Sequence, residues 1–198
     1  MLATLKGYFF PERIRSRVEL ARFVSGEASY VAQRSTYEFS RNTLAWYGQA
    51  AFGDPKFNEA FAVCRWEAFA ALAADMMTIL RFFLDAGPEF DPALLQVHAD
   101  VLGEYPAPVH RPDGWGDRHA ALLGRFAGTT SSHRPDLKAM GHRTGLLIHE
   151  CAPARSKNAE EERAVLAAAA TFGLISFSDR LPKRLDRAAL RVALRHAA

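Results

Sequence analysis

A row of polar and aromatic side chains marks one stretch of this sequence as a candidate binding surface. Five residues spaced three and four positions apart share one side of a predicted helix: Glu27, Tyr30, Arg34, Tyr37 and Arg41. A core-facing helix would carry Leu, Ile or Val there. Arginine offers planar donors to a carboxylate or phosphate, and tyrosine offers a wall and a hydroxyl. The row, with Glu38 beside it, therefore predicts a pocket or groove for an anionic ligand.

A carboxylate on the next predicted helix is the candidate counterpart of this row. Asp75 falls on an apolar stripe, and a carboxylate on an apolar face needs a partner. The structural alternative to a ligand pocket is therefore an ion-pair network between the arginines of the row and the nearby carboxylates Glu38, Glu67 and Asp75. A third alternative, a row that simply faces solvent, is disfavoured by its two tyrosines.

Sequence motifs of catalysis are missing from this chain. It contains no G-x-S-x-G nucleophile elbow, no Walker loop and no G-x-G-x-x-G turn. Burial would raise the pKa of Glu38, Glu67 or Asp75 and suit one of them to acid-base chemistry, although the same holds for many structural carboxylates. The sequence thus leaves open a small helical-bundle enzyme with a carboxylate acid or base and an arginine anion clamp.

Histidine and acidic residues do not form the pattern of a metal site. No Glu-x-x-His pair occurs, and di-iron helical bundles require two of them. His142 and His149 share one helical face but lie seven residues apart rather than four, so they are poorly spaced to grip one ion. His98 or His119 would have to supply a further ligand. We predict neither a metal nor another cofactor.

Cysteine content and hydropathy favour a cytoplasmic protein. Cys64 and Cys151 have neither the number nor the spacing of a disulfide framework or a zinc site, and Cys64 is expected to be a small core residue. The N-terminus has no sustained apolar region of an export signal. The longest apolar run, residues 164–177, is shorter than the roughly 20 residues that span a bilayer. It predicts a buried helix and no transmembrane segment.

Charge is concentrated at the C-terminal end. Residues 180–198 hold six of the 25 Lys and Arg and one of the 22 Asp and Glu, which gives this tail +5 and the remainder −2. Its amphipathic pattern places Arg187, Arg191 and Arg195 along one edge, with Leu181, Leu185, Ala188 and Val192 on the apolar face. Such a helix suits nucleic acid, an anionic membrane surface or an acidic protein. The alternative is a docked terminal helix with a solvated arginine face.

Helical periodicity dominates the sequence, and no stretch alternates like a half-buried strand. We predict an all-α fold: one helical domain over residues 1–198, a bundle of six to eight helices with a long central helix hairpin, and a basic amphipathic helix within 180–198 that is peripheral. The predicted helices are 13–24, 27–51, 55–85, a shorter one from 91, 117–127, 136–151, 159–177 and 186–196. Gly26 separates the first two. Residues 105–116, rich in proline and glycine, are a candidate hinge or functional loop.

These patterns favour a non-catalytic binding or interaction protein. Its helix face of Tyr30, Arg34, Tyr37, Glu38 and Arg41, with Asp75 opposite, would engage an anionic small molecule or an acidic protein partner. The basic tail would provide a second anionic contact. The sequence leaves open whether the chain is an enzyme and whether it forms a homo-oligomer.

Overall fold

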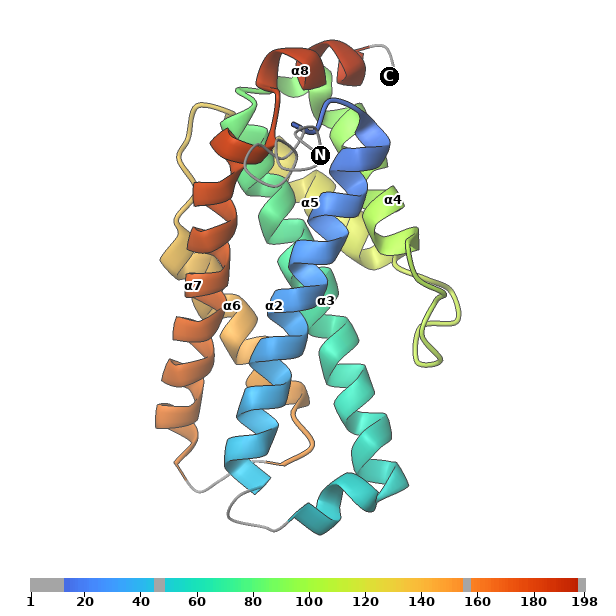
Figure 1. Cartoon of the computed structure of the whole chain (residues 1–198), viewed down its shortest axis with the longest axis vertical. Coiled ribbons are helices and arrows are strands. Elements are labelled where there is room, and N and C mark those ends of the chain that lie inside the picture. Colours follow the sequence, from blue (N-terminus) through green and yellow to red (C-terminus); the bar gives the residue numbers. More distant parts are fainter. Residues whose placement is uncertain (1–12, 45–48, 155–157, 196–198) are drawn as a thin grey trace, which may run out of the picture.

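Seven α-helices and two short 3-10 helices make up the described part of the chain (Figure 1). The computed structural model describes residues 13–44, 49–154 and 158–195, and the side chains of residues 41–44 and 49 lie outside that description. With the labels of Figure 1, the helices are α2 (Arg17–Leu44), η1 (Gln49–Gly53), α3 (Pro55–Phe83), η2 (Pro88–Phe90), α4 (Asp91–Gly103), α5 (Gly116–Ala127), α6 (Leu137–Cys151), α7 (Ala159–Arg184) and α8 (Arg187–Arg195). Across these ranges, β-type pairing is limited to one isolated bridge between Ile14 and Leu185. The predicted all-α, single-domain helical bundle is confirmed.

The helices α2 and α3 form the long central hairpin of the bundle, as predicted. They run side by side through the length of the molecule (Figure 1). On one side of α2 lies α7, which pairs closely with α6, and α4 and α5 lie toward the other side. The short helix α8 crosses one end of the bundle.

The helix α2 runs unbroken through Gly26, so the predicted interruption there is wrong. Glycine inside a helix costs about 1 kcal/mol relative to alanine. The apolar stripe nevertheless continues on both sides of it, because Leu20, Val24 and Ala28 are all fully buried. Tertiary packing of this stripe outweighs the local propensity. At its other end α2 is described as far as Leu44, and residues 49–53 form the 3-10 helix η1 instead of the α-helix predicted to continue to residue 51.

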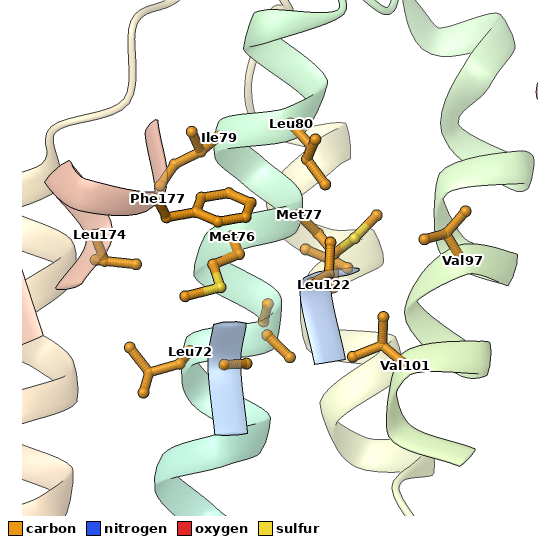
Figure 2. Packing of buried hydrophobic residues seen from close by; sticks show 14 of the residues in the cluster. Leu72, Met76, Met77, Ile79, Leu80, Val97, Val101, Leu122, Leu174 and Phe177 are labelled. Atoms are coloured by element: carbon orange, nitrogen blue, oxygen red, sulfur yellow. The ribbon is translucent and has the colours of Figure 1, made fainter. Parts of the chain in front are cut away.

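The helix α3 begins as its sequence predicts and forms the centre of the core. Asp54 caps it by accepting a hydrogen bond from the backbone nitrogen of Lys56 at 2.9 Å, and Pro55 occupies the first turn. Beyond that turn, α3 packs against α2, α4, α5, α6 and α7. Figure 2 shows Phe177 of α7 on one side of α3 and Val97 of α4 on the other.

Two glycines allow α6 and α7 to pack closely. A Cβ added to Gly145 would lie 2.4 Å from the backbone nitrogen of Ala167, and one added to Gly141 would lie 2.6 Å from that of Thr171. Both distances are shorter than any contact a real side chain makes, so the two backbones can approach this closely only with glycine on α6. This contact holds α6 against the outer helix α7.

The helix α7 is longer and more exposed than its sequence predicts. It continues past the predicted end at residue 177 to Arg184, through Pro182. Only one face is buried: Leu174 and Phe177 are inaccessible, whereas Phe172 is 67% exposed. The expectation of a fully buried helix is therefore wrong.

By length and composition alone, α7 is the one helix of the described ranges that could cross a membrane. An 18-residue window within it has a mean hydropathy of 1.3, and 33% of that window is buried in the fold. Core helices of soluble proteins pass the same test. The predictions of a cytoplasmic protein and of no transmembrane segment stay predictions.

Candidate functional site

The polar row on α2 faces solvent over its middle part. Tyr30 and Tyr37 are 56% and 50% exposed, and Arg34, also exposed, donates a hydrogen bond from its Nη1 to the Tyr30 hydroxyl at 3.2 Å. Glu27 is half-buried and forms an ion pair with Arg180 of α7. The exposure of Tyr30, Arg34 and Tyr37 thus agrees with the alternative that we disfavoured, because the tyrosine hydroxyls can remain hydrated while the rings lie along the helix surface.

Glu38 and Arg41, two further members of the predicted site, belong to the same helix. Glu38 is half-buried, and the side chain of Arg41 lies outside the described residues. Asp75 does not serve as counterpart of the row, since its contacts go to α5 and α6. A ligand-binding role for the row stays a prediction.

Glu67 of α3 anchors the loop that follows α4. Arg111 donates to both of its carboxylate oxygens, from Nε to Oε1 at 2.7 Å and from Nη2 to Oε2 at 2.9 Å. Arg118 also donates to Glu67, and Nε2 of His110 lies 3.1 Å from Oε1. Burial disfavours the charge, but the hydrogen bonds from Arg111 and Arg118 outweigh it and lower the pKa of Glu67 to about 2. The predicted hinge at residues 105–116 is therefore tied to the core.

Asp75 lies on α3 eight positions after Glu67, where α3 meets α5 and α6. Its side chain is 2% exposed. Nη1 of Arg125 on α5 donates to Oδ1 at 2.8 Å, Nη2 of Arg143 on α6 approaches the same oxygen at 3.4 Å, and Thr144 donates to Oδ2 at 3.0 Å. Burial raises the pKa of Asp75, and the two arginines offset this only in part. The ionised carboxylate thus gains less from its partners than it loses by leaving water.

A cavity of about 330 Å³ opens beside this junction. It lies between α3, the end of α5, the start of α6 and the segment 128–136 that joins α5 to α6. We call it the arginine cavity, because three guanidinium groups line it together with hydroxyl and apolar side chains. Its lining includes Arg81, Arg125, Arg143, Thr129, Thr130, Ser131, His133, Phe82, Pro135 and Met140.

The three arginines of the cavity are not equally engaged. Arg81 is saturated, since it forms a two-pronged pair with Asp91 at 2.7 and 3.1 Å and donates to the carbonyl of Thr129 at 2.8 Å. Arg125 and Arg143 share the single carboxylate of Asp75, and their side chains are 37% and 54% exposed. Each guanidinium group has five N–H donors, so each keeps donors beyond the one that reaches Asp75.

One acidic residue also lines the arginine cavity. Asp136 uses its side chain as the N-cap of α6, where Oδ1 accepts from the backbone nitrogens of Lys138 and Ala139, both at 3.0 Å. The positive end of the α6 dipole lies at the same place. The negative charge of Asp136 is therefore balanced by the positive end of the α6 dipole as well as by the arginines of the cavity.

Among the described residues, His98 and His119 meet as a pair. His98 is fully buried between α4 and α5, where its Nδ1 lies 3.3 Å from Nδ1 of His119. On α6, His149 is buried near Glu162, with Nε2 and Oε2 3.3 Å apart, while His142 is exposed. Burial, followed by the nearby His119, lowers the pKa of His98 to about 4. Over the ranges described, no three His, Cys, Asp or Glu side chains are grouped as metal ligands.

The arginines of α8 make contacts inside the fold. Nη1 of Arg191 donates to the carbonyls of Leu84 and Asp85, at the end of α3. The guanidinium groups of Arg191 and Arg195 lie over the ring of Phe90, 4.8 and 5.3 Å from its centre. Cations at a helix C-terminus satisfy its last carbonyls and its dipole. Binding of the tail to nucleic acid, a membrane surface or an acidic protein stays a prediction.

The buried face of α8 differs from the one we expected. Leu190 and Leu194 are buried, whereas Val192 is 57% exposed and Ala188 is also exposed. Leu181 and Leu185, which precede α8, are buried as expected, but within α8 the expected apolar face was wrong by about half a turn. Because Leu190 and Leu194 are the buried residues of α8, Arg191 on its arginine edge faces the end of α3 and Phe90.

Sequence reasoning missed the arginine cavity. Arg81, Arg125 and Arg143 belong to three helices, and Arg125 and Arg143 lie 50 and 68 positions from their shared partner Asp75. One local signal was present: the segment GTTSSHRPD at 128–136 has the small polar composition of a loop between helices.

This chain matches no protein-family model, no curated protein and no solved structure.

Proposed function

We propose that this protein is a non-catalytic binding protein that holds a small organic anion in the arginine cavity. The observation that carries the proposal is the sharing of one buried carboxylate by Arg125 and Arg143, both of which line the cavity. Two guanidinium groups facing one carboxylate leave donors and positive charge for a second anion. Arginine pairs with a carboxylate or phosphate through charge-assisted hydrogen bonds, which are the strong ones.

The lining supports a ligand with an acidic head and an apolar body. Phe82, Pro135 and Met140 provide apolar wall, and the hydroxyls of Thr130 and Ser131 provide neutral polar contacts beside the guanidinium groups. A volume of about 330 Å³ is within the range of small-molecule sites. Aryl and alkyl carboxylates and small phosphate monoesters fit this description.

The enzyme alternative is less well supported. It would use Asp75 as acid or base, since burial raises its pKa. Both Asp75 oxygens, however, already accept hydrogen bonds from Arg125 and Thr144, and the side chain is 2% exposed. A general base must reach the proton that it abstracts. This favours binding without catalysis.

A calorimetric titration with a panel of aryl carboxylates, alkyl carboxylates and phosphate monoesters tests the proposal. We expect Arg143→Gln to raise the Kd of each panel member that binds by about 10-fold or more, because a charge-assisted hydrogen bond is lost. Arg143 is the better choice for substitution because its side chain is more exposed than that of Arg125.

Arg34→Gln on the exposed row of α2 is the matched control. It should leave the Kd unchanged, since Arg34 does not line the cavity. The reverse result, with Arg34→Gln weakening binding and Arg143→Gln leaving it intact, would move the site to the row on α2.

A further inference from the structure

Two cysteines that are distant in the sequence meet at the end of α6. The Sγ atoms of Cys64 on α3 and Cys151, the last residue of α6, lie 2.8 Å apart, and neither is in a disulfide. Both thiols also approach the carbonyl oxygen of Ile148, at 3.4 and 3.6 Å. The sequence spacing did not reveal this pair, because 87 positions separate its members.

We propose that Cys64 and Cys151 form a reversible oxidation site, at which hydrogen peroxide converts the two thiols into an intramolecular disulfide between α3 and α6. The contact between the two sulfur atoms carries the proposal. A disulfide bond is about 2.05 Å long, so the sulfurs need to move by less than 1 Å relative to each other.

The two thiols differ in access, and this sets their order of reaction. Cys64 is 1% exposed, whereas Cys151 is partly exposed and lines a shallow hollow of about 370 Å³ with Lys56 and Glu59. The hydrogen bond that its thiol shares with Cys151, and then burial, raise the pKa of Cys64 above the ordinary value of a thiol. Cys151 is therefore the thiol that reacts with peroxide first, and Cys64 is the thiol that resolves the product.

The chemistry balances in two steps. The sulfur of Cys151, as thiolate, attacks one oxygen of hydrogen peroxide, so that the O–O bond breaks, a sulfenic acid forms and hydroxide leaves to become water with the thiol proton. The sulfur of Cys64 then attacks the Cys151 sulfur, the S–O bond breaks, and the departing hydroxyl takes the Cys64 proton as a second water. Two thiols are oxidised by two electrons, and one peroxide is reduced to two waters. A small dithiol reductant reverses the bond by exchange.

Intact-mass spectrometry of the full chain tests this inference cleanly, because the chain has two cysteines in total. After peroxide treatment, unfolding and maleimide labelling, the expected product carries no maleimide and has lost about 2 Da, the mass of two hydrogen atoms. Dithiothreitol should restore two maleimide additions. Peptide mapping should recover the peptide of Cys64 linked to that of Cys151.

Two single variants separate the roles of the thiols. Cys64→Ser should stop at a sulfenic acid on Cys151, which dimedone traps, because the resolving thiol is missing. In Cys151→Ser, the buried Cys64 should react with peroxide at least 10-fold more slowly than Cys151 does in the parent chain. Labelling of both cysteines after peroxide, a disulfide between two chains, or equal reactivity of Cys64 in the Cys151→Ser variant would each overturn the proposal.

Discussion

Asp75 and Glu67 show how one helix holds two buried carboxylates with opposite outcomes. Both lie on α3 and both pair with arginines from later helices or loops. Glu67 receives a two-pronged bond from Arg111, and its pKa falls to about 2. Asp75 is more deeply buried and receives one short bond from Arg125 and a long one from Arg143, so its pKa rises. Under the proposed function, the weaker pairing of Asp75 with Arg125 and Arg143 is what allows these two arginines to pair with a bound anion as well.

Neutralising Asp75 should therefore strengthen anion binding. Asp75→Asn keeps the shape of the side chain but removes the charge that competes for Arg125 and Arg143. We expect the Kd of a bound carboxylate to fall about 3- to 10-fold in calorimetry. Glu67→Gln is the control, since Glu67 does not line the cavity, and its Kd should match the parent. Weaker binding by Asp75→Asn would contradict this view of the charge balance.

At the scale of elements, a glycine of α6 and a glycine of α2 differ in whether the fold has room for a Cβ atom. Gly145 on α6 is required by contact, because its added Cβ would lie 2.4 Å from the backbone of Ala167 on α7. Gly26 on α2 has nothing within 4 Å of the corresponding position and is exposed. Helix propensity alone predicts that either glycine weakens its helix.

Alanine substitutions at these two positions should therefore change stability in opposite directions. Gly145→Ala forces α6 and α7 apart and should lower the free energy of unfolding by about 2 to 4 kcal/mol. Gly26→Ala should raise it by roughly 0.5 to 1 kcal/mol, because alanine is the better helix former. Denaturant unfolding of the two variants measures both effects. Equal destabilisation by the two changes would be inconsistent with the close packing of α6 on α7.

Local rules predicted most elements, and tertiary contacts explain the exceptions. The start of α3 followed from Asp54 and Pro55, whose capping chemistry acts within a few residues. The break at Gly26 was wrong because burial of the stripe on α2 outweighs the cost of one glycine. The candidate site was harder to predict: spacing shows that Tyr30, Arg34 and Tyr37 share a face, but only packing decides that this face points to solvent.

At the scale of the whole molecule, α3 connects the sites of the bundle. Cys64, Glu67, Asp75 and Arg81 follow one another along it, and each meets a different partner from later in the chain. Arg191 of the basic C-terminal helix α8 donates a hydrogen bond to the carbonyl of Leu84, which caps the C-terminus of α3. Stability of the bundle is therefore coupled to the ionisation of groups that surround α3.

Acid should destabilise the protein in two successive windows. The pKa of His98 is about 4 in the fold against 6.5 for the ordinary side chain, so the unfolded chain binds the proton first as pH falls from 6.5 to 4. The pKa of Glu67 is about 2 against 4.5, so its contribution is lost between pH 4.5 and 2. Asp75, whose pKa is raised, acts in the opposite direction. Each depressed group lowers the free energy of unfolding on acidification.

Unfolding by denaturant at several pH values checks the first window. His98→Gln should remove about 3 kcal/mol of the pH dependence between pH 6.5 and 4, while leaving the lower window in place. His142→Gln, which changes an exposed histidine of α6, is the control and should keep the slope of the parent. An unchanged slope in His98→Gln would show that this ring is not the acid-sensitive group.

The position of the bound anion tests the proposed function most directly. A crystal of the protein soaked with a halogenated aryl carboxylate from the panel locates the ligand by the anomalous signal of its halogen. We expect the carboxylate within hydrogen-bonding distance of Arg125 and Arg143, with its ring against Phe82 and Met140. A carboxylate seated instead against Tyr30, Arg34 and Tyr37 on α2, with the arginine cavity filled by water, would contradict the proposal.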